Sequence, residues 1–129
     1  MAQKIIHADD DKMTREFYQA VHHRTFPSYE LVQFEDGKSL KESLEKLAGD
    51  GVALVLTDNS MPGMSGAEII KEYAGDSRYS NTKFILFYGG DARIGKEAVL
   101  NGAFAFIEKP ASMITEVVPL MKQALGIND

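Results

Sequence analysis

Acidic side chains follow two short apolar runs of the chain, and a lysine follows a third. Asp9 and Asp10 come directly after residues 4–8, Asp58 ends residues 54–58, and Lys109 closely follows residues 104–107. In a parallel α/β sheet the carboxyl ends of the strands face one crevice, so side chains at these ends can meet there. Clustered carboxylates favour a hard divalent cation, and an aspartate beside such a cation is a competent nucleophile toward phosphorus.

Electrostatic repulsion explains why this cluster needs a cation. Two carboxylates 4 Å apart repel by about 1 kcal/mol in bulk water and by about 4 kcal/mol at an effective dielectric constant of 20. Lys109 balances one of the three negative charges. We therefore expect Mg²⁺, or Mn²⁺, to balance the other two in an all-oxygen site. The metal and the lysine would then neutralise charge on a phosphoryl group during its transfer.

Five apolar runs alternate with amphipathic segments along the chain. The sequence predicts strands over residues 4–8, 29–34, 54–58, 84–88 and 104–107. It also predicts five helices. The first begins near Asp11 or Thr14 and stops at Phe26-Pro27, the second covers residues 40–48, and the third begins at Ser65 and ends near Gly75. The fourth covers residues 92–100, and the fifth covers residues 114–125, with Pro119 in its first turns or at a kink. We expect Met13, Phe17, Tyr18 and Val21 to recur on the first helix at helical spacing.

This strict alternation predicts the fold class α/β. We expect a doubly wound five-stranded parallel sheet in the flavodoxin-like order 2-1-3-4-5, with helices on both faces and the polar second strand at an edge. The switch point of that order lies between strands 1 and 3, which places Asp9, Asp10 and Asp58 side by side. Residues 1–129 are expected to form a single domain.

Composition narrows the possible functions. The 129 residues carry a net charge of −5 and no cysteine, which argues against direct nucleic-acid binding and excludes thiol chemistry. No apolar run approaches the roughly 18 residues that a membrane span needs, and the N-terminus does not have the pattern of a signal peptide. We expect a cytoplasmic protein with no membrane contact.

The chain resembles the receiver domain of two-component response regulators, most closely the stand-alone, CheY-like ones. The resemblance rests on the acidic pair Asp9-Asp10, on Asp58 followed by the sequence MPGMSG at residues 61–66, and on the pair Lys109-Pro110. Together, in this order and spacing, these motifs are highly specific, and they cover essentially the whole chain.

The resemblance implies a role for each matching residue. Asp58 looks like the phosphoacceptor and Lys109 like the contact to the phosphoryl oxygens. Asp10 and Asp58 would bind the metal directly, Asp9 would act mostly through water, and Ser60 would offer its backbone carbonyl. In this family the bond between the lysine and the proline is cis.

The chain departs from the receiver pattern at the end of the fourth strand. Receivers carry Thr or Ser there, whereas this chain offers only aromatic residues: Phe87 if one counts back from Lys109, and Tyr88 if one aligns the apolar run. We prefer Tyr88, because Gly89 then supplies the small residue that usually follows. Phe106 matches the mobile aromatic residue of the fifth strand, and it has no hydroxyl group. We expect an altered switch that involves Tyr88 and Phe106.

Two functions remain open at this stage. In the first, a sensor histidine kinase or phosphotransfer protein phosphorylates Asp58, and the signal leaves by contact with a downstream protein target, because so short a chain has no room for an output domain. We expect such a domain to hydrolyse at most its own phosphate and not to be a turnover enzyme. In the second, the chain is a pseudo-receiver, which is an interaction module independent of phosphorylation.

Other patterns are weaker. A haloacid-dehalogenase-type phosphohydrolase would want a second Asp two residues after the nucleophile, where Ser60 stands. Residues 90–97 nearly match a phosphate-binding loop but end on Glu97 instead of a hydroxyl residue. We expect His22 and His23 to be solvated or helix-end histidines, and His7 to be a strand residue packed under the first or the last helix.

Overall fold

The strand order confirms the topology expected from the sequence. The computed structural model describes residues 3–127. Its five strands are all parallel and are ordered β2-β1-β3-β4-β5. Their bounds are β1 Lys4–Ala8, β2 Glu30–Phe34, β3 Val52–Asp58, β4 Lys83–Tyr88 and β5 Ala105–Glu108. Strand β3 is central, and every one of its residues is buried. The polar strand β2 lies at an edge, as predicted.

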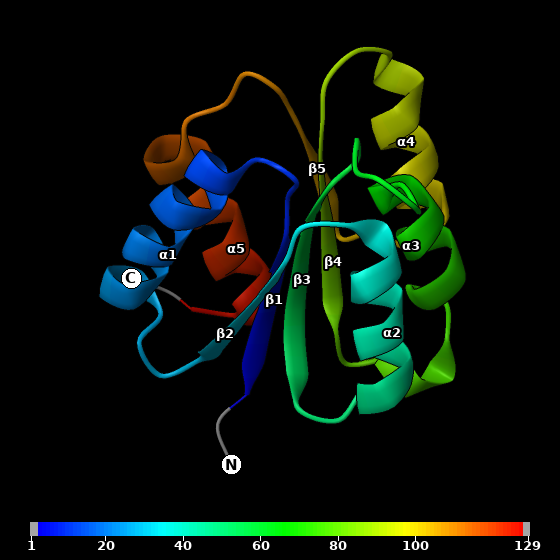
Figure 1. The fold of residues 1–129 in the computed structure, drawn as a ribbon, viewed down its shortest axis with the longest axis horizontal. Helices are drawn as coiled ribbons and strands as arrows, with labels where there is room; N and C mark the ends of the chain where they lie inside the picture. The colour runs from blue at the N-terminus through cyan, green and yellow to red at the C-terminus, as the bar shows by residue number, and fades with distance from the viewer. Residues whose placement is uncertain (1–2, 128–129) are drawn as a thin grey trace.

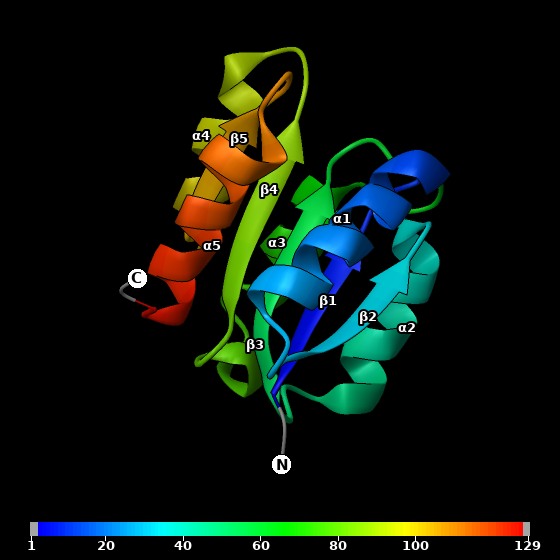
Figure 2. The same ribbon diagram turned by 90° about the vertical axis from the view of Figure 1, so that its left-hand side faces the viewer.

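Helices cover both faces of this sheet. Helices α1 (Lys12–Thr25) and α5 (Val118–Leu125) lie on one face, and α2 (Gly37–Leu47), α3 (Gly66–Tyr73) and α4 (Ala92–Leu100) lie on the other (Figure 1). Figure 2 looks onto the α1 and α5 face and shows the twist of the strands behind it. In the described part of the chain, no helix is both long and apolar enough to cross a membrane.

Side-chain caps fix where several helices begin. Ser65 and Glu68 form the predicted capping box at the start of α3, with each side chain bound to the other residue's backbone N–H. Asp11, Asp36 and Asp91 cap α1, α2 and α4 from one side only, each accepting a backbone N–H from the first helical turn. Each cap satisfies a donor that the helix itself cannot pair.

The last helix is irregular before its proline. Residues Met113–Val117 form a π-helical turn (η2), in which the N–H groups of Val117 and Val118 reach back five residues. Pro119 then lies in the first turn of α5, a position at which a helix tolerates proline. This arrangement confirms the sequence prediction for Pro119. π-Helical turns are rare and occur often at functional sites.

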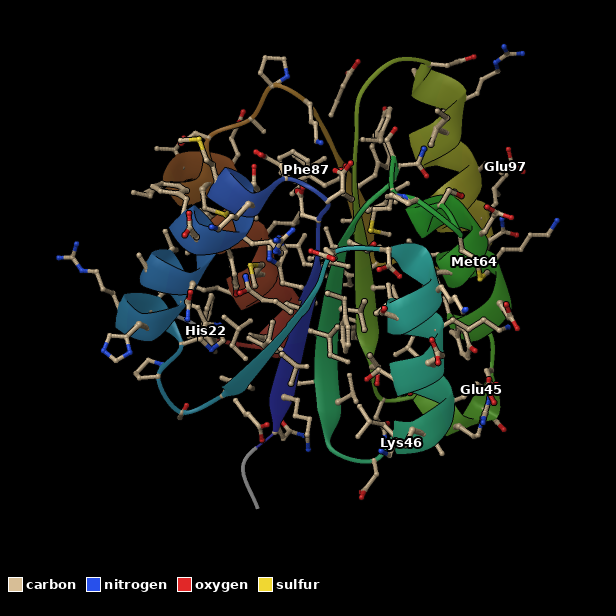
Figure 3. All side chains as sticks on the ribbon, in the orientation of Figure 1. His22, Glu45, Lys46, Met64, Phe87 and Glu97 are labelled. Carbon is tan, nitrogen blue, oxygen red and sulfur yellow. The ribbon has the colours of Figure 1, made fainter. Side chains whose placement is uncertain are left out.

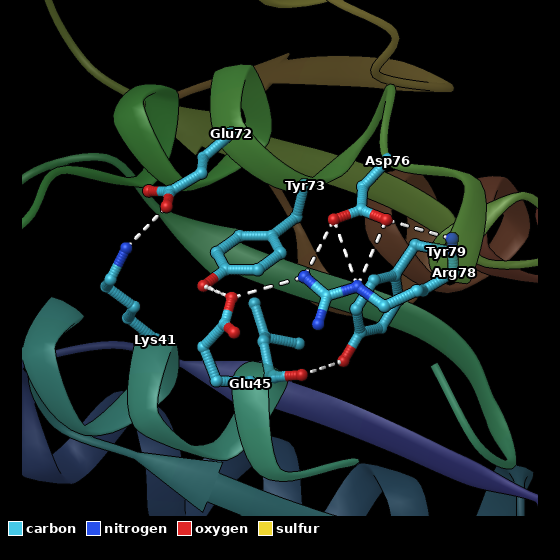
Figure 4. A network of polar contacts seen from close by, with 8 residues as sticks. Lys41, Glu45, Glu72, Tyr73, Asp76, Arg78 and Tyr79 are labelled. Carbon is cyan, nitrogen blue, oxygen red and sulfur yellow. Dashed lines mark hydrogen bonds and ion pairs between the residues drawn. The ribbon is translucent and has the colours of Figure 1, made fainter. Parts of the chain in front are cut away.

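A polar network joins α2 to the segment that follows α3 (Figure 4). The Tyr73 hydroxyl donates to Glu45 at 2.6 Å, and Arg78 pairs with both Asp76 and Glu45. The Tyr79 hydroxyl donates to the Leu44 carbonyl at 2.6 Å. This segment leads into the amino end of β4, so the network braces the end of the sheet opposite the acidic residues.

The face covered by α1 contains two buried histidines. His7 packs its ring 4.6 Å from that of Tyr18, as the sequence predicts. His22 lies in the last turn of α1, which confirms its expected place at a helix end, but it is only 5% exposed and therefore not solvated. Its Nε2 donates to the Tyr29 carbonyl at 2.8 Å, and its Nδ1 accepts from the Tyr18 hydroxyl at 3.1 Å. The helix turns His22 inward, whereas its neighbour His23 is exposed.

Burial keeps both inner histidines neutral. It lowers the pKa of His7 to about 3 and, partly offset by the bond to Tyr29, lowers the pKa of His22. The unfolded chain therefore binds more protons than the folded chain below about pH 6.5, and stability is lost as the pH falls through that value.

We predict that His22→Gln flattens the dependence of the free energy of unfolding on pH between 7.5 and 5, because each buried histidine contributes up to about 1.4 kcal/mol per pH unit. Urea unfolding at a series of pH values measures the slope. His23→Gln is the matched control and should keep the wild-type slope. Equal slopes in wild type and His22→Gln would contradict the prediction.

Candidate functional site

Three carboxylates converge at the carboxyl end of the sheet. Asp9 and Asp10 follow β1, Asp58 ends β3, and one oxygen from each lies within 4.8 Å of the other two. Asp9 and Asp58 are 5% and 4% exposed, whereas Asp10 is open to solvent. The strand order therefore brings together the acidic residues that the sequence singled out.

Lys109 completes this cluster. Its Nζ lies 2.8 Å from Oδ1 of Asp58, and its backbone N–H donates to the Tyr88 carbonyl at 2.6 Å. The Lys109-Pro110 bond is cis, as the resemblance implied. The lysine side chain is 37% exposed, so its ammonium reaches the cluster from the mouth of the site.

The loop after β3 fixes the position of the Asp58 side chain through hydrogen bonds. The N–H of Asn59 donates to Oδ1 of Asp58 at 2.9 Å and, in a shared contact, to the Phe87 carbonyl. The Asn59 side chain accepts the N–H of Ala67 at 3.0 Å. A Cβ on Gly66 would lie 2.3 Å from the Asp58 carbonyl oxygen, so only glycine lets α3 start this close to β3. Sequence reasoning missed Asn59, because its role depends on where α3 begins.

Burial and like charges act together on Asp9. Burial, followed by the Asp58 and Asp10 carboxylates, raises the pKa of Asp9, while the Asp11 N–H bond and the Lys109 ammonium lower it. The net shift is upward. The fold therefore disfavours the charged form of Asp9, and a bound cation would reduce this energetic cost.

The donor set fits a hard divalent cation. Every candidate ligand is an oxygen, and one ammonium cannot balance three carboxylates. Magnesium binds oxygens at about 2.1 Å, so two ligands of one ion lie up to about 4.2 Å apart. One oxygen from each of the three carboxylates lies within 4.8 Å of the other two, so the cluster needs little contraction to surround one ion. Ser60 lies in the exposed loop after β3, and its backbone carbonyl as a further ligand stays a prediction.

A family comparison agrees with this arrangement. The model of the response regulator receiver domain matches residues 5–118. The chain belongs to this family. It is a signalling domain of the two-component type, and no curated protein matches it significantly.

Solved receiver structures share the fold. A response regulator receiver domain from Clostridium thermocellum matches with a TM-score of 0.83 at 20% identity, over 96% of this chain and 94% of that one. A LuxR-family DNA-binding response regulator from Staphylococcus aureus matches with a TM-score of 0.79 at 24% identity, over 95% and 98%. The chemotaxis response regulator CheY4 of Vibrio cholerae matches with a TM-score of 0.79 at 20% identity, over 97% and 100%. At these identities the likeness concerns the fold.

Phe87 lies on the side of strand β4 that faces the acidic cluster. Its Cα pairs in register with that of Asp58, and its ring centroid lies 5.3 Å from Nζ of Lys109. Figure 3 shows Phe87 at the carboxyl end of the sheet on the side of α1. The preference for Tyr88 at this position is therefore wrong, and the count back from Lys109 gives the right residue. Successive side chains of a strand point to opposite faces, so a shift of one residue moves the ring to the other side.

Tyr88 instead packs under α4. It is 1% exposed and belongs to the hydrophobic layer beneath α2, α3 and α4. Its ring centroid lies 5.8 Å from that of Phe106, which is 38% exposed. The two expected switch residues thus contact each other, but neither lines the acidic cluster. A Cβ on Gly95 would lie 2.5 Å from the Phe106 ring and 2.7 Å from the Tyr88 ring.

We predict that Gly95→Ala lowers the free energy of unfolding by about 1–3 kcal/mol, because the added methyl overpacks both rings. The loss should appear although alanine favours helix by about 1 kcal/mol over glycine. Urea unfolding measures the change. Gly75→Ala is the control, since a Cβ there meets nothing within 4 Å. A stabilised Gly95→Ala protein would refute this packing.

We predict that Asp9→Asn raises the free energy of unfolding by about 1 kcal/mol without divalent cations, because it removes a buried charge and keeps the acceptor for the Asp11 N–H. It should also weaken the stabilisation that millimolar MgCl₂ gives the wild type. Thermal unfolding with and without MgCl₂ measures both effects. Asp50→Asn, in the exposed turn before β3, should behave like wild type. Full Mg²⁺ stabilisation of Asp9→Asn would count against Asp9 as part of the metal site.

Proposed function

We propose that this receiver accepts a phosphoryl group on Asp58 from the phosphohistidine of a sensor histidine kinase or a phosphotransfer protein. Asp9, Asp10 and Asp58, with the Ser60 carbonyl, would hold Mg²⁺, or Mn²⁺. The observation that carries the proposal is the convergence of three carboxylates from two strand ends on one lysine ammonium. An unused cluster of this kind would only cost stability.

The geometry gives each group a task. Lys109 and the Asn59 N–H both bind Oδ1 of Asp58, which favours the other carboxylate oxygen as the nucleophile. The ammonium of Lys109 lies close enough to move from that carboxylate to the oxygens of an arriving phosphoryl group. A bound divalent cation would supply the remaining charge neutralisation. The Asn59 bond holds the aspartate in place while the phosphorus–nitrogen bond of the donor breaks.

Transfer of the signal would follow from a contact with a downstream protein. The half-exposed Phe106 and the face formed by α4 and β5 lie next to Tyr88, whose backbone carbonyl binds Lys109. Movement of Lys109 could therefore reach that face. The chain would act as a phosphorylated switch in the cytoplasm and not as a turnover enzyme.

A specific feature favours the pseudo-receiver as a second candidate. Phe87 brings a ring and no hydroxyl to the side of the cluster where Lys109 lies. A phosphoryl group would thus lack one hydrogen-bond donor that the family usually offers. In this case the chain would bind its partner without modification.

The first proposal predicts that beryllofluoride with Mg²⁺ forms an adduct on Asp58, because this complex mimics a phosphoryl group on a carboxylate. ¹⁹F NMR detects the bound fluorides, and intact-protein mass spectrometry detects the phosphoryl group left by acetyl phosphate. Both signals should vanish in Asp58→Asn, and Lys109→Ala should weaken them at least tenfold.

Asp91→Asn serves as the control for these measurements. Asp91 lies at the same end of the sheet but pairs with Arg93 at 2.6 Å, outside the cluster. Its loss should leave both signals intact. A wild-type protein that forms no adduct with either reagent would rule out phosphorylation and leave the pseudo-receiver.

A further inference from the structure

An apolar recess leads away from the phosphoacceptor. It has a volume of about 790 Å³ and lies between α1 and the segment that follows β5. Asp58 and Lys109 line its inner end, and Met13, Phe17 and Met113 line its outer part. Phe87 forms part of the wall between the two ends.

The outer walls are not explained by the packing of the core. Met13 is 77% exposed and Phe17 is 52% exposed, although the helical spacing of the sequence placed both on one face with the buried Tyr18. Met113 comes from the π-helical turn, whose irregular backbone carries it on the opposite rim. Two large apolar side chains left in water on one rim, with the half-buried Met113 on the other, indicate a binding surface.

Charge divides the recess into two ends. The charged residues that line it are Asp9, Asp58 and Lys109, and all three belong to the acidic cluster. His7, which also lines it, is 3% exposed, and its Nδ1 accepts a hydrogen bond from the Gln33 amide at 3.0 Å. The remaining lining side chains are uncharged. A matching small ligand has a phosphoryl group at one end and a short apolar group at the other.

The chemistry of the acceptor narrows the class of such ligands. A phosphorylated aspartate is a mixed anhydride of a carboxylic and a phosphoric acid. Exchange with another acyl phosphate breaks and forms the same type of bond, so the transfer is close to thermoneutral. A simple phosphate ester is a much weaker donor. Among small molecules that carry an oxygen-linked phosphoryl group and match the recess, acyl phosphates are therefore the class that can phosphorylate Asp58.

We propose that the recess binds the acyl group of small apolar acyl phosphates, so that donors with three to five carbons phosphorylate Asp58 faster than acetyl phosphate does. This inference rests on the proposed function of Asp58. In the transfer, a carboxylate oxygen of Asp58 forms a bond to phosphorus while the bond from phosphorus to the acyl oxygen breaks. The electron pair of that bond leaves with the acyl group as a free carboxylate anion, and no proton is required.

The recess gives the leaving group an apolar environment. Met13 and Phe17 on one rim and Met113 on the other would contact the alkyl chain, while Lys109 and the metal hold the phosphoryl end. Full removal of one methylene from water corresponds to about a fourfold change in a rate or binding constant. Because the recess is open on one side, we expect each added methylene to lose only about half of its contact with water. The rate constant should then rise about twofold per methylene.

The test measures the second-order rate constant for phosphorylation of the full chain with Mg²⁺ and acetyl, propionyl, butyryl or valeryl phosphate, read by intact-protein mass spectrometry. The wild-type rate should rise about twofold with each methylene. In Phe17→Ser and Met13→Gln the series should flatten, so that the longer donors lose most of their advantage over acetyl phosphate. Both side chains are exposed, so these variants should fold.

Leu100→Gln is the matched control. Leu100 is 86% exposed at the end of α4, outside the recess, and its loss should leave the chain-length series unchanged. A second readout needs no reaction. Without Mg²⁺, butyryl phosphate should shift the methyl NMR signals of Met13 and Met113 more than acetyl phosphate does, and it should leave that of Met64 unchanged.

The possible failures are distinct. No phosphorylation by any donor, with no beryllofluoride adduct, would overturn the proposed function and this inference with it. Phosphorylation by acetyl phosphate at a rate that longer donors do not exceed would overturn the inference alone. A flat series, combined with slower transfer from a phosphohistidine protein to Phe17→Ser, would assign the recess to a protein surface instead.

Discussion

Repulsion among three carboxylates and its partial relief by one ammonium is the constraint on which the rest of this structure depends. The cluster forms because parallel strands end at the same edge of the sheet, and because β1 and β3 are neighbours at the switch point of the strand order. Asp9 and Asp58 are buried there, so water can screen them only weakly. The fold therefore holds a cluster in which one ammonium faces three carboxylates, and this excess of negative charge is the property on which the proposed function rests.

The aromatic residues at the end of β4 change what surrounds that site. Phe87 places a ring beside the Lys109 ammonium, a contact that stabilises the cation without a hydrogen bond. Tyr88 fills the space beneath α4 and packs against Phe106, and Gly95 provides the room for both rings. Phe87 and Tyr88 are consecutive residues on opposite faces of β4. One lies beside the acidic cluster and the other beneath the surface formed by α4 and β5. Neither Phe87 nor Phe106 carries a hydroxyl group, so any contact between these positions is one of packing.

Much of this arrangement can be read from the sequence, for physical reasons. The alternation of apolar runs with amphipathic segments fixes a parallel sheet, and the handedness of crossover connections leaves few possible orders. The cluster of Asp9, Asp10, Asp58 and Lys109 follows, since each residue directly succeeds or ends a strand. The caps at Ser65 and Glu68 also follow, because capping depends on residues close together in the chain.

Tertiary structure alone decided the features that depend on orientation. A strand turns alternate side chains to opposite faces, so apolar composition could not tell whether Phe87 or Tyr88 faces Asp58; the register with β3 settled it. Helical spacing could not show that α1 turns His22 inward and leaves Phe17 in water, because that depends on what lies opposite each helix face. The sequence by itself determined the elements, their order and the acidic cluster, through local patterns and chain connectivity. Contacts between segments far apart in the chain determined which side chains surround that cluster.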